Sequence, residues 1–170
     1  FKPLALRPFG NKPVWIGYDP AESGDSAGLV VIAPPEPDYP KFRLLEHHQF
    51  KGMDFASQAQ YIKKLTTKYN VKYIGLDKSG MGTGVAQLVL DFFPNLTTFN
   101  YSVDVKTQLV MKAMDVINKG RFEFDAGSTD VAMSIMAIRK TLTASQRQMT
   151  FEASRAENVG HCDLAWALLH

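Results

Sequence analysis

The chain has little cysteine, little net charge and no long apolar run, and the first and last of these shortages each exclude a class of protein. Cys162 is the only cysteine among 170 residues, so a disulfide framework is excluded and a reducing compartment is the simpler expectation. No stretch approaches the roughly 18 apolar residues that a membrane-spanning helix needs. The formal net charge is +2, so no strong overall field indicates a nucleic-acid partner, although a local basic patch is compatible with that total. With 45% hydrophobic residues, a chain of this length can form one domain with a substantial core.

Apolar periodicity predicts an antiparallel meander in the first third of the chain. Strands are expected over 14–19, 27–33 and 42–50, with a hairpin joining the first two and a proline-rich loop before the third. A helix then begins after Asp54, which is a suitable N-cap. The strand that follows it, at 71–77, is expected to lie parallel to the earlier ones because a helical crossover precedes it.

The rest of the chain is expected to be mainly helical. The predicted elements are a helix near 85–92, a strand at 96–101, helices at 105–118 and 129–142, a strand at 148–151 and a helix at 163–169. Three antiparallel strands followed by strand–helix–strand units are typical of a ribonuclease H-like α/β fold, in which helices flank a central mixed sheet. A doubly wound fold would need strands and helices to alternate from the start.

Three aspartates occupy the most informative positions in this pattern. Asp19 and Asp77 each end an apolar strand, and Asp163 lies in the first turn of the last predicted helix. A carboxylate at the mouth of a buried strand is costly unless something pairs with it. If the three meet at one edge of the sheet, a hard divalent cation would be their natural partner, as in metal-dependent phosphoryl transfer. Taken singly, each has a simpler explanation as a turn former or a helix cap.

The sequence around these acids resembles that of a known family. Three short motifs carry the resemblance: Tyr18-Asp19-Pro20-Ala21 with Gly24-Asp25-Ser26-Ala27, Gly75-Leu76-Asp77 before Gly80 and Gly82, and His161-Cys162-Asp163 with Ala165 and Ala167. In this order, and on these elements, they resemble the C-terminal nuclease domain of the terminase large subunit, the DNA-packaging motor of tailed bacteriophages. The resemblance extends over nearly the whole chain.

The resemblance implies a metal-dependent endonuclease. Such a domain would cut concatemeric double-stranded DNA during genome packaging, with two Mg²⁺ or Mn²⁺ ions as cofactors. Carried over by motif, the catalytic and metal-binding acids are Asp19, Asp77 and Asp163. Asp19 is expected to bridge both ions, with Asp77 on one and Asp163 on the other. Asp25 matches a position that can support the second metal, although a turn residue is an equally simple interpretation.

The resemblance also implies partners. In the full-length protein they would be an N-terminal ATPase domain, the portal protein and the small terminase subunit. The protein would act in the host cell cytoplasm, without contact with a membrane, and would not be packaged in the virion. Residues 1–13 are expected to be a linker remnant from that ATPase domain, and 14–170 the nuclease domain. The turn over 79–84 is rich in glycine but lacks the Gly-Lys-Ser/Thr ending of a P-loop, and no P-loop occurs elsewhere, so this chain is not expected to hydrolyse ATP itself.

Basic residues outside the acid motifs are candidates for contact with DNA. His161 lies two positions before Asp163, and Lys106 lies near the start of a predicted helix. Arg139, Lys140 and Arg147 are expected to form a phosphate-tracking rim with salt-dependent binding. The simpler interpretation of such charges is a solvated face.

Three alternatives remain open on the sequence alone. The first is another ribonuclease H-like nuclease, of the junction resolvase or transposase type. The second is a fragment of an actin-like ATPase, which Asp77-Lys78-Ser79-Gly80 resembles loosely, although 170 residues are too few for two such lobes. The third is a DNA-binding module without catalytic activity, which the presence of all three acids disfavours.

Overall fold

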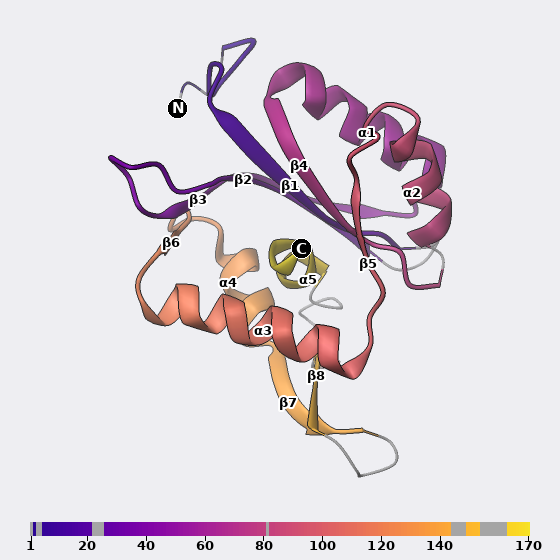
Figure 1. Cartoon of the computed structure of the whole chain (residues 1–170), viewed down its shortest axis with the longest axis vertical. Coiled ribbons are helices and arrows are strands. Elements are labelled where there is room, and N and C mark those ends of the chain that lie inside the picture. The colour runs from indigo at the N-terminus through magenta and orange to yellow at the C-terminus, as the bar shows by residue number, and fades with distance from the viewer. Residues whose placement is uncertain (1, 3–4, 22–25, 81, 144–148, 154–162) are drawn as a thin grey trace.

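A six-stranded mixed sheet organises the computed structural model, which describes residues 2, 5–21, 26–80, 82–143, 149–153 and 163–170 (Figure 1). The elements in chain order are β1 Pro13–Asp19, β2 Ser26–Ala33, β3 Phe42–Lys51, α1 Phe55–Lys68, β4 Asn70–Asp77, α2 Gly82–Leu90, β5 Thr97–Phe99, α3 Val103–Asn118, β6 Phe122–Glu123, α4 Thr129–Met136, β7 Ile138–Leu142, β8 Met149–Ala153 and α5 Asp163–Leu169.

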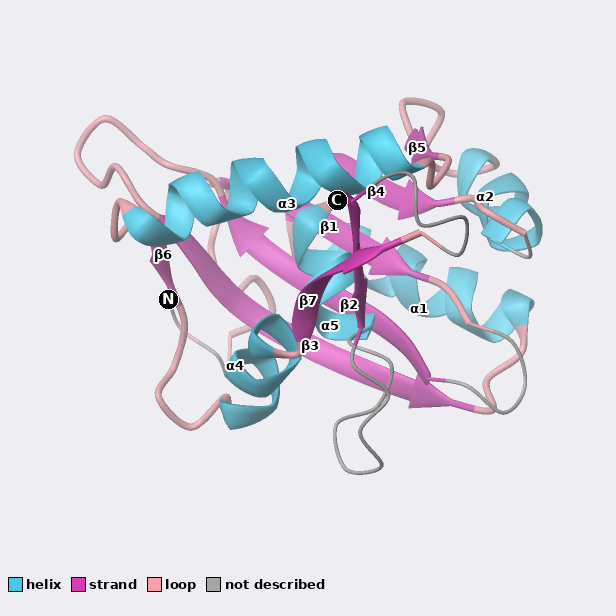
Figure 2. Ribbon diagram, turned by 90° about the horizontal axis from the view of Figure 1, so that it is seen from below, coloured by secondary structure: helices cyan, strands magenta, loops and turns pink. Residues whose placement is uncertain are grey.

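The strand order confirms the predicted topology. It is β5-β4-β1-β2-β3-β6. The β1–β2 and β2–β3 pairs are antiparallel, whereas β4 and β5 are added in parallel beside β1, and β6 is parallel to β3. Figure 2 shows the long strands β3, β2, β1 and β4 side by side. Asp54 caps α1 as predicted, because its carboxylate accepts a 2.9 Å hydrogen bond from the Ser57 N–H.

The two faces of the sheet are covered by different helices (Figure 1). On one face, alternate residues of β1 such as Val14, Ile16 and Tyr18 pack in one cluster with residues of α1 and α2. On the other face, Val30 and Ile32 of β2 pack with residues of α4 and α5. Because side chains alternate along a strand, the residues between those of the first cluster, including Asp19 and Asp77, are on the α5 face.

The helix predicted over 129–142 is wrong in its second half. The structure ends α4 at Met136 and turns 138–142 into β7, which pairs antiparallel with β8. Ile138 and Leu142 are four residues apart, and that spacing suits one face of a helix and one face of a strand equally well. The long-range partner β8 decides between them, and the predicted strand at 148–151 is confirmed in its described part.

Two further findings concern the short strand β6 and the segment that precedes β1. β6 was not predicted, since it contains only two residues and pairs with the start of β3. Phe9, which precedes β1, is 8% exposed and belongs to the main core. The division into a linker over 1–13 and a nuclease domain over 14–170 stays a prediction. None of the helices in the described ranges is long and apolar enough to cross a membrane.

Candidate active site

Asp19 and Asp77 end neighbouring parallel strands. The β1–β4 ladder aligns Gly17 with Gly75 and Tyr18 with Leu76, and each aspartate is the next residue along its strand. The carboxyl ends of parallel strands meet at one edge of a sheet, so these two side chains project from adjacent positions on the α5 face. Asp77 is 9% exposed and Asp19 is half-buried.

Asp163 reaches the same edge because α5 and the residue after it, His170, lie against glycines in three strands. A Cβ on Gly17 would be 1.8 Å from the Ala167 carbonyl oxygen, and one on Gly28 would be 2.3 Å from that of Asp163. A Cβ on Gly75 would be 2.6 Å from the His170 carbonyl oxygen. Glycine inside a strand often marks such a close approach of another backbone, and this is the signal in the sequence that could have located α5.

The close approach at Gly28 brings the third acid beside the first. Gly28 is the ladder partner of Asp19 in the β1–β2 pair, and the backbone of Asp163 crosses directly over it. Asp163 is 5% exposed and is the first residue of α5. The structure therefore brings together Asp19, Asp77 and Asp163, which are far apart in the sequence, on one face at one end of the sheet.

The acids interact electrostatically. Burial raises the pKa of Asp19 well above its usual range, and the negative charges of Asp163 and Asp77 raise that pKa further. The positive charge of Lys106 opposes this rise in the pKa of Asp19. Neighbouring carboxylates in a poorly solvated site resist ionisation together, so the cluster is a place where added positive charge is stabilising.

The chemistry of this donor set suits a hard divalent cation. Mg²⁺ prefers carboxylate oxygens and usually keeps several waters, so it needs only one or two protein carboxylates. Within the described part of the chain, no three His, Cys, Asp or Glu side chains form a closed ligand set. The acids therefore fit the ion by donor type and charge, and they would have to draw closer to hold it. Asp25 and His161 lie outside the described residues.

A hydrogen-bond chain orients Asp77. Its Oδ1 accepts a 2.7 Å hydrogen bond from the Ser79 N–H, and the Ser79 hydroxyl oxygen accepts one of 2.8 Å from the Tyr101 N–H. The glycine-rich turn passes close to the site, since a Cβ on Gly82 would be 2.0 Å from the Asp77 carbonyl oxygen. These contacts give Asp77 a defined direction toward the α5 face.

His170 is a functional candidate that the sequence analysis missed. Its Nδ1 is 3.0 Å from the Tyr18 carbonyl oxygen, and its Nε2 contacts the Tyr101 hydroxyl. Burial lowers the pKa of His170 to about 3, so the ring is neutral at physiological pH and can donate to Tyr18 while accepting from Tyr101. It thereby ties the end of α5 to β1 and to the segment after β5. His170 lies in no recognisable sequence motif, and only its position in the structure identifies it as a candidate.

The predicted DNA-contacting residues fall into two groups in the structure. Lys106 lies over the rings of Tyr101 and Trp166, and its positive charge opposes the rise in the pKa of Asp19. Arg139 and Lys140 are exposed on β7, in the hairpin that projects beyond α3 in Figure 1. Phe151 of β8 packs against a cluster that contains Val110 of α3 and Trp166 of α5, so the hairpin is anchored to the same helical layer. Arg147 lies outside the described residues.

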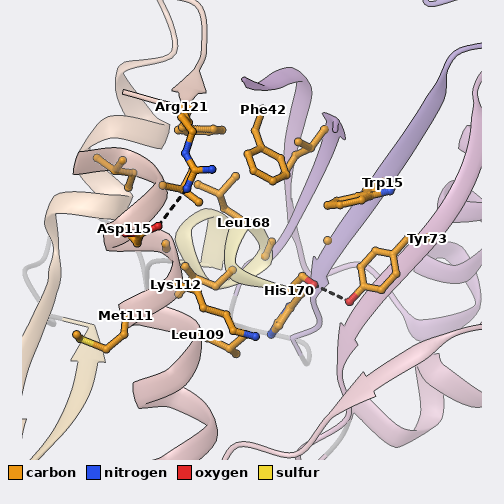
Figure 3. Close-up of a pocket in the computed structure, with 18 of the residues that line it drawn as sticks. Trp15, Phe42, Tyr73, Leu109, Met111, Lys112, Asp115, Arg121, Leu168 and His170 are labelled. Atoms are coloured by element: carbon orange, nitrogen blue, oxygen red, sulfur yellow. Dashed lines mark hydrogen bonds and ion pairs between the residues drawn. The ribbon is translucent and has the colours of Figure 1, made fainter. Parts of the chain in front are cut away.

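A separate groove of about 880 Å³ lies between α3, α5 and the sheet (Figure 3). Its lining is mostly apolar and includes Trp15, Phe42, Tyr73 and Leu168. The few polar contacts drawn there are the Asp115–Arg121 ion pair and the hydrogen bond from the Tyr73 hydroxyl to the His170 carbonyl oxygen. None of the three acids lines this groove, so it is not where they would meet a phosphodiester.

Comparison with known proteins identifies the fold. The sequence model of the terminase RNaseH-like domain matches residues 16–170. "Terminase, ATPase subunit" of Escherichia phage P2 is 56% identical over 170 residues, which are 100% of this chain and 29% of that protein. "Probable terminase, ATPase subunit" of Haemophilus phage HP1 is 40% identical over 169 residues, which are 99% of this chain and 28% of that protein.

Among solved structures, the large terminase nuclease from thermophilic phage G20c with bound magnesium superposes with a TM-score of 0.74. It is 23% identical, and the match covers 92% of this chain and 78% of that one. The predicted ribonuclease H-like fold is confirmed. The chain spans less than a third of the length of the curated relatives.

Proposed function

This chain belongs to the terminase RNaseH-like domain family, and we propose that it is the metal-dependent endonuclease domain of a phage terminase large subunit. Its reaction would be the hydrolysis of phosphodiester bonds in concatemeric double-stranded DNA during genome packaging. The observation that carries the proposal is the convergence of Asp19, Asp77 and Asp163 at one end of the sheet. A stable fold gains nothing from three neighbouring carboxylates, because they repel one another in a poorly solvated site.

The proposed division of labour follows from the positions of the acids. Asp19 lies between the other two, since Asp77 is its neighbour on β4 and Asp163 crosses over its ladder partner on β2. Asp19 would therefore bridge two Mg²⁺ or Mn²⁺ ions, with Asp77 on one and Asp163 on the other. When bound, these ions would lower the pKa of the attacking water and offset the charge that develops on the phosphate. Asp25 and His161 stay predicted contributors to the same site.

The test is cleavage of supercoiled plasmid DNA by the 170-residue chain in Mg²⁺, in Mn²⁺ and in EDTA. We expect nicked and linear products with either metal and none in EDTA. A folded protein that leaves the plasmid intact with both metals would contradict the proposal for this chain. A strong preference for four-way junctions over linear duplex would instead favour the resolvase alternative.

Basic residues near the acids and on the hairpin would bind the DNA backbone. Lys106 would meet a phosphate near the cluster, and Arg139 and Lys140 on β7 would contact phosphates further along the duplex. Arg147 stays a predicted phosphate contact. Because these are phosphate contacts, the domain is expected to bind DNA with little sequence specificity.

If the β7–β8 hairpin contacts DNA phosphates, removing its basic residues should change the salt dependence of the affinity for DNA. Replacing Arg139 and Lys140 together with alanine is expected to weaken DNA binding about uniformly across sequences. The slope of log affinity against log salt should fall by roughly 2, because each lost phosphate contact releases about one counterion less. Fluorescence anisotropy of a labelled duplex in EDTA, measured over a salt series, gives this slope. Lys72, an exposed residue of β4, provides the matched control as Lys72→Ala, and an unchanged slope in the double variant would exclude β7 from the interface.

The remaining partners belong to the longer protein. Both curated relatives carry the name of an ATPase subunit, and this chain matches 29% and 28% of their lengths. We propose that the ATP-hydrolysing part lies in the portion of such a subunit outside this chain, since the chain has no P-loop. We also propose that this longer protein acts together with the portal protein and the small terminase subunit in the host cytoplasm.

A further inference from the structure

Gln58 is a buried polar side chain in an apolar part of the core. It lies in the first turn of α1 and is 1% exposed, next to Ala59 and one helical turn before Ile62, which belong to the main core cluster. Burying an amide in such surroundings is unfavourable unless its donors and its acceptor find partners. The partners of Gln58 therefore show what this position gains from a polar residue.

Three hydrogen bonds satisfy the Gln58 amide. Its Nε2 donates to two backbone carbonyl oxygens, that of Ala21 at 3.1 Å and that of Met53 at 2.5 Å. Its Oε1 accepts a hydrogen bond from the Tyr18 hydroxyl. Carbonyl oxygens can only accept, so the two of them fix which end of the amide is the nitrogen. One side chain thus joins β1, the segment that follows β1 and the loop that precedes α1.

These contacts lie on both sides of Asp19 in the chain. Tyr18 precedes the acid, and its backbone is already fixed by the ladders to β2 and β4. Ala21 follows the acid by two residues and lies beyond the last ladder pair of β1, which is Asp19 with Gly28. The hydrogen bond from Gln58 to Ala21 therefore holds the chain at the point where it has left the sheet.

Gln58 acts from the opposite face of the sheet to the acids. Tyr18 packs with residues of α1 and α2, whereas the next residue, Asp19, is on the α5 face. Gln58 can therefore fix the backbone around Asp19 without occupying the space in front of its carboxylate. On the α5 side, His170 Nδ1 lies 3.0 Å from the Tyr18 carbonyl oxygen, so the residue before Asp19 is held from both faces.

We propose that Gln58 is a positioning residue of the active site, which fixes the chain immediately after Asp19 and thereby the place where its carboxylate meets a divalent cation. In the proposed mechanism Asp19 bridges both ions, so a shift of its backbone would displace both. Misplacing a reacting group by about 1 Å can cost about a hundredfold in rate. This inference rests on the proposed nuclease function, because it assigns Gln58 a role toward a metal ligand of that same site.

The test combines a calorimetric titration of Mg²⁺ into metal-free protein with the rate of plasmid nicking. Gln58→Met keeps the length of the side chain and removes its three hydrogen bonds. We expect its Kd for Mg²⁺ to rise about tenfold and its nicking rate at saturating Mg²⁺ to fall about tenfold or more. Tyr18→Phe removes a buried hydrogen bond but leaves both carbonyl contacts of Gln58, so its Kd should stay within about twofold of the wild-type value. Gln60→Met makes the same chemical change at an exposed position of α1 and should have no effect.

Melting curves separate positioning from folding. Gln58→Met and Tyr18→Phe should both melt below the wild type, because each leaves a buried polar group unpaired. The double variant Tyr18→Phe/Gln58→Met removes both partners of one hydrogen bond, so it should recover part of the lost stability while keeping the raised Kd, and it carries the comparison if Gln58→Met alone does not fold. A wild-type Kd in these folded variants, or a Kd that merely follows stability, would overturn the inference while the nuclease proposal stands. If the wild type binds no Mg²⁺ and leaves the plasmid intact, the proposed function fails and the inference fails with it.

Discussion

Asp77→Asn is expected to reduce metal-dependent DNA cleavage by about a thousandfold or more while leaving the fold intact. A loss of that size corresponds to about 4 kcal/mol of transition-state stabilisation, which is the scale of a lost metal ligand. The asparagine Oδ1 can still accept the hydrogen bond from the Ser79 N–H, so the local geometry is preserved. Asp19→Asn should have a similar effect on cleavage. It should also raise the melting temperature in EDTA, since Asp19 is the acid whose ionisation the other two oppose.

The matched control for both variants is Asp91→Asn, which makes the same chemical change at an exposed aspartate just after α2. Its cleavage rate and melting temperature should equal those of the wild type. The measurement is the initial rate of plasmid nicking over a range of Mg²⁺ concentrations, with melting curves of the same preparations. Cleavage by Asp77→Asn at more than about a tenth of the wild-type rate would remove Asp77 from the catalytic assignment.

Gly17→Ala and Gly28→Ala are expected to destabilise the protein strongly although each adds one methyl group. The new Cβ would lie 1.8 Å from the Ala167 carbonyl oxygen at Gly17, and 2.3 Å from that of Asp163 at Gly28. Both obstacles are backbone atoms of α5, so no side-chain rotation can relieve the overlap and the helix must move. Overpacking of this kind costs roughly 3 kcal/mol, which for a chain of this size lowers the melting temperature by about 6–12 °C.

Gly28→Ala should also lose cleavage activity at temperatures where it remains folded, because the residue it displaces is Asp163. The matched control is Gly84→Ala in α2, where the new Cβ would be 3.0 Å from the Phe55 ring. That half-buried ring can rotate, and alanine favours a helix over glycine by up to about 1 kcal/mol, so the net change should be within about 1 kcal/mol. Stabilities of Gly17→Ala and Gly28→Ala equal to that of the control would show that α5 does not lie against these strands.

The sheet was predictable because its signals are local. The apolar runs of β1, β2, β3 and β4 are bounded by turn residues, and their order in the chain limits the topologies that are possible. The helix α1 begins at the predicted N-cap, Asp54, because a cap depends only on the residues of one turn. The segment over 138–142 was not predictable in the same way. Its apolar spacing fits either period, and pairing with β8 selects the strand.

The candidate site also contains features that local sequence signals predict and features that depend on contacts between distant segments. The positions of Asp19 and Asp77 at strand ends follow from the apolar pattern, since each acid stops a buried run. The approach of Asp163 to them depends on α5 and His170 lying against Gly17, Gly28 and Gly75. Glycines in strands indicate that a backbone passes close by, but no short-range pattern shows which backbone it is. His170 carries no local signal because its partners, Tyr18 and Tyr101, are 152 and 69 residues away.

By itself, the sequence determined most of the elements, their order and the family, and it predicted the three acids, because these depend on residue type and on spacing over a few residues. Tertiary structure alone decided how the acids converge and that a hairpin replaces the end of a helix. Each of these depends on which distant segments come into contact. Such contacts are set by the free energy of the whole packed chain, and here the absence of side chains at three glycines allows the last helix to bring Asp163 to Asp19.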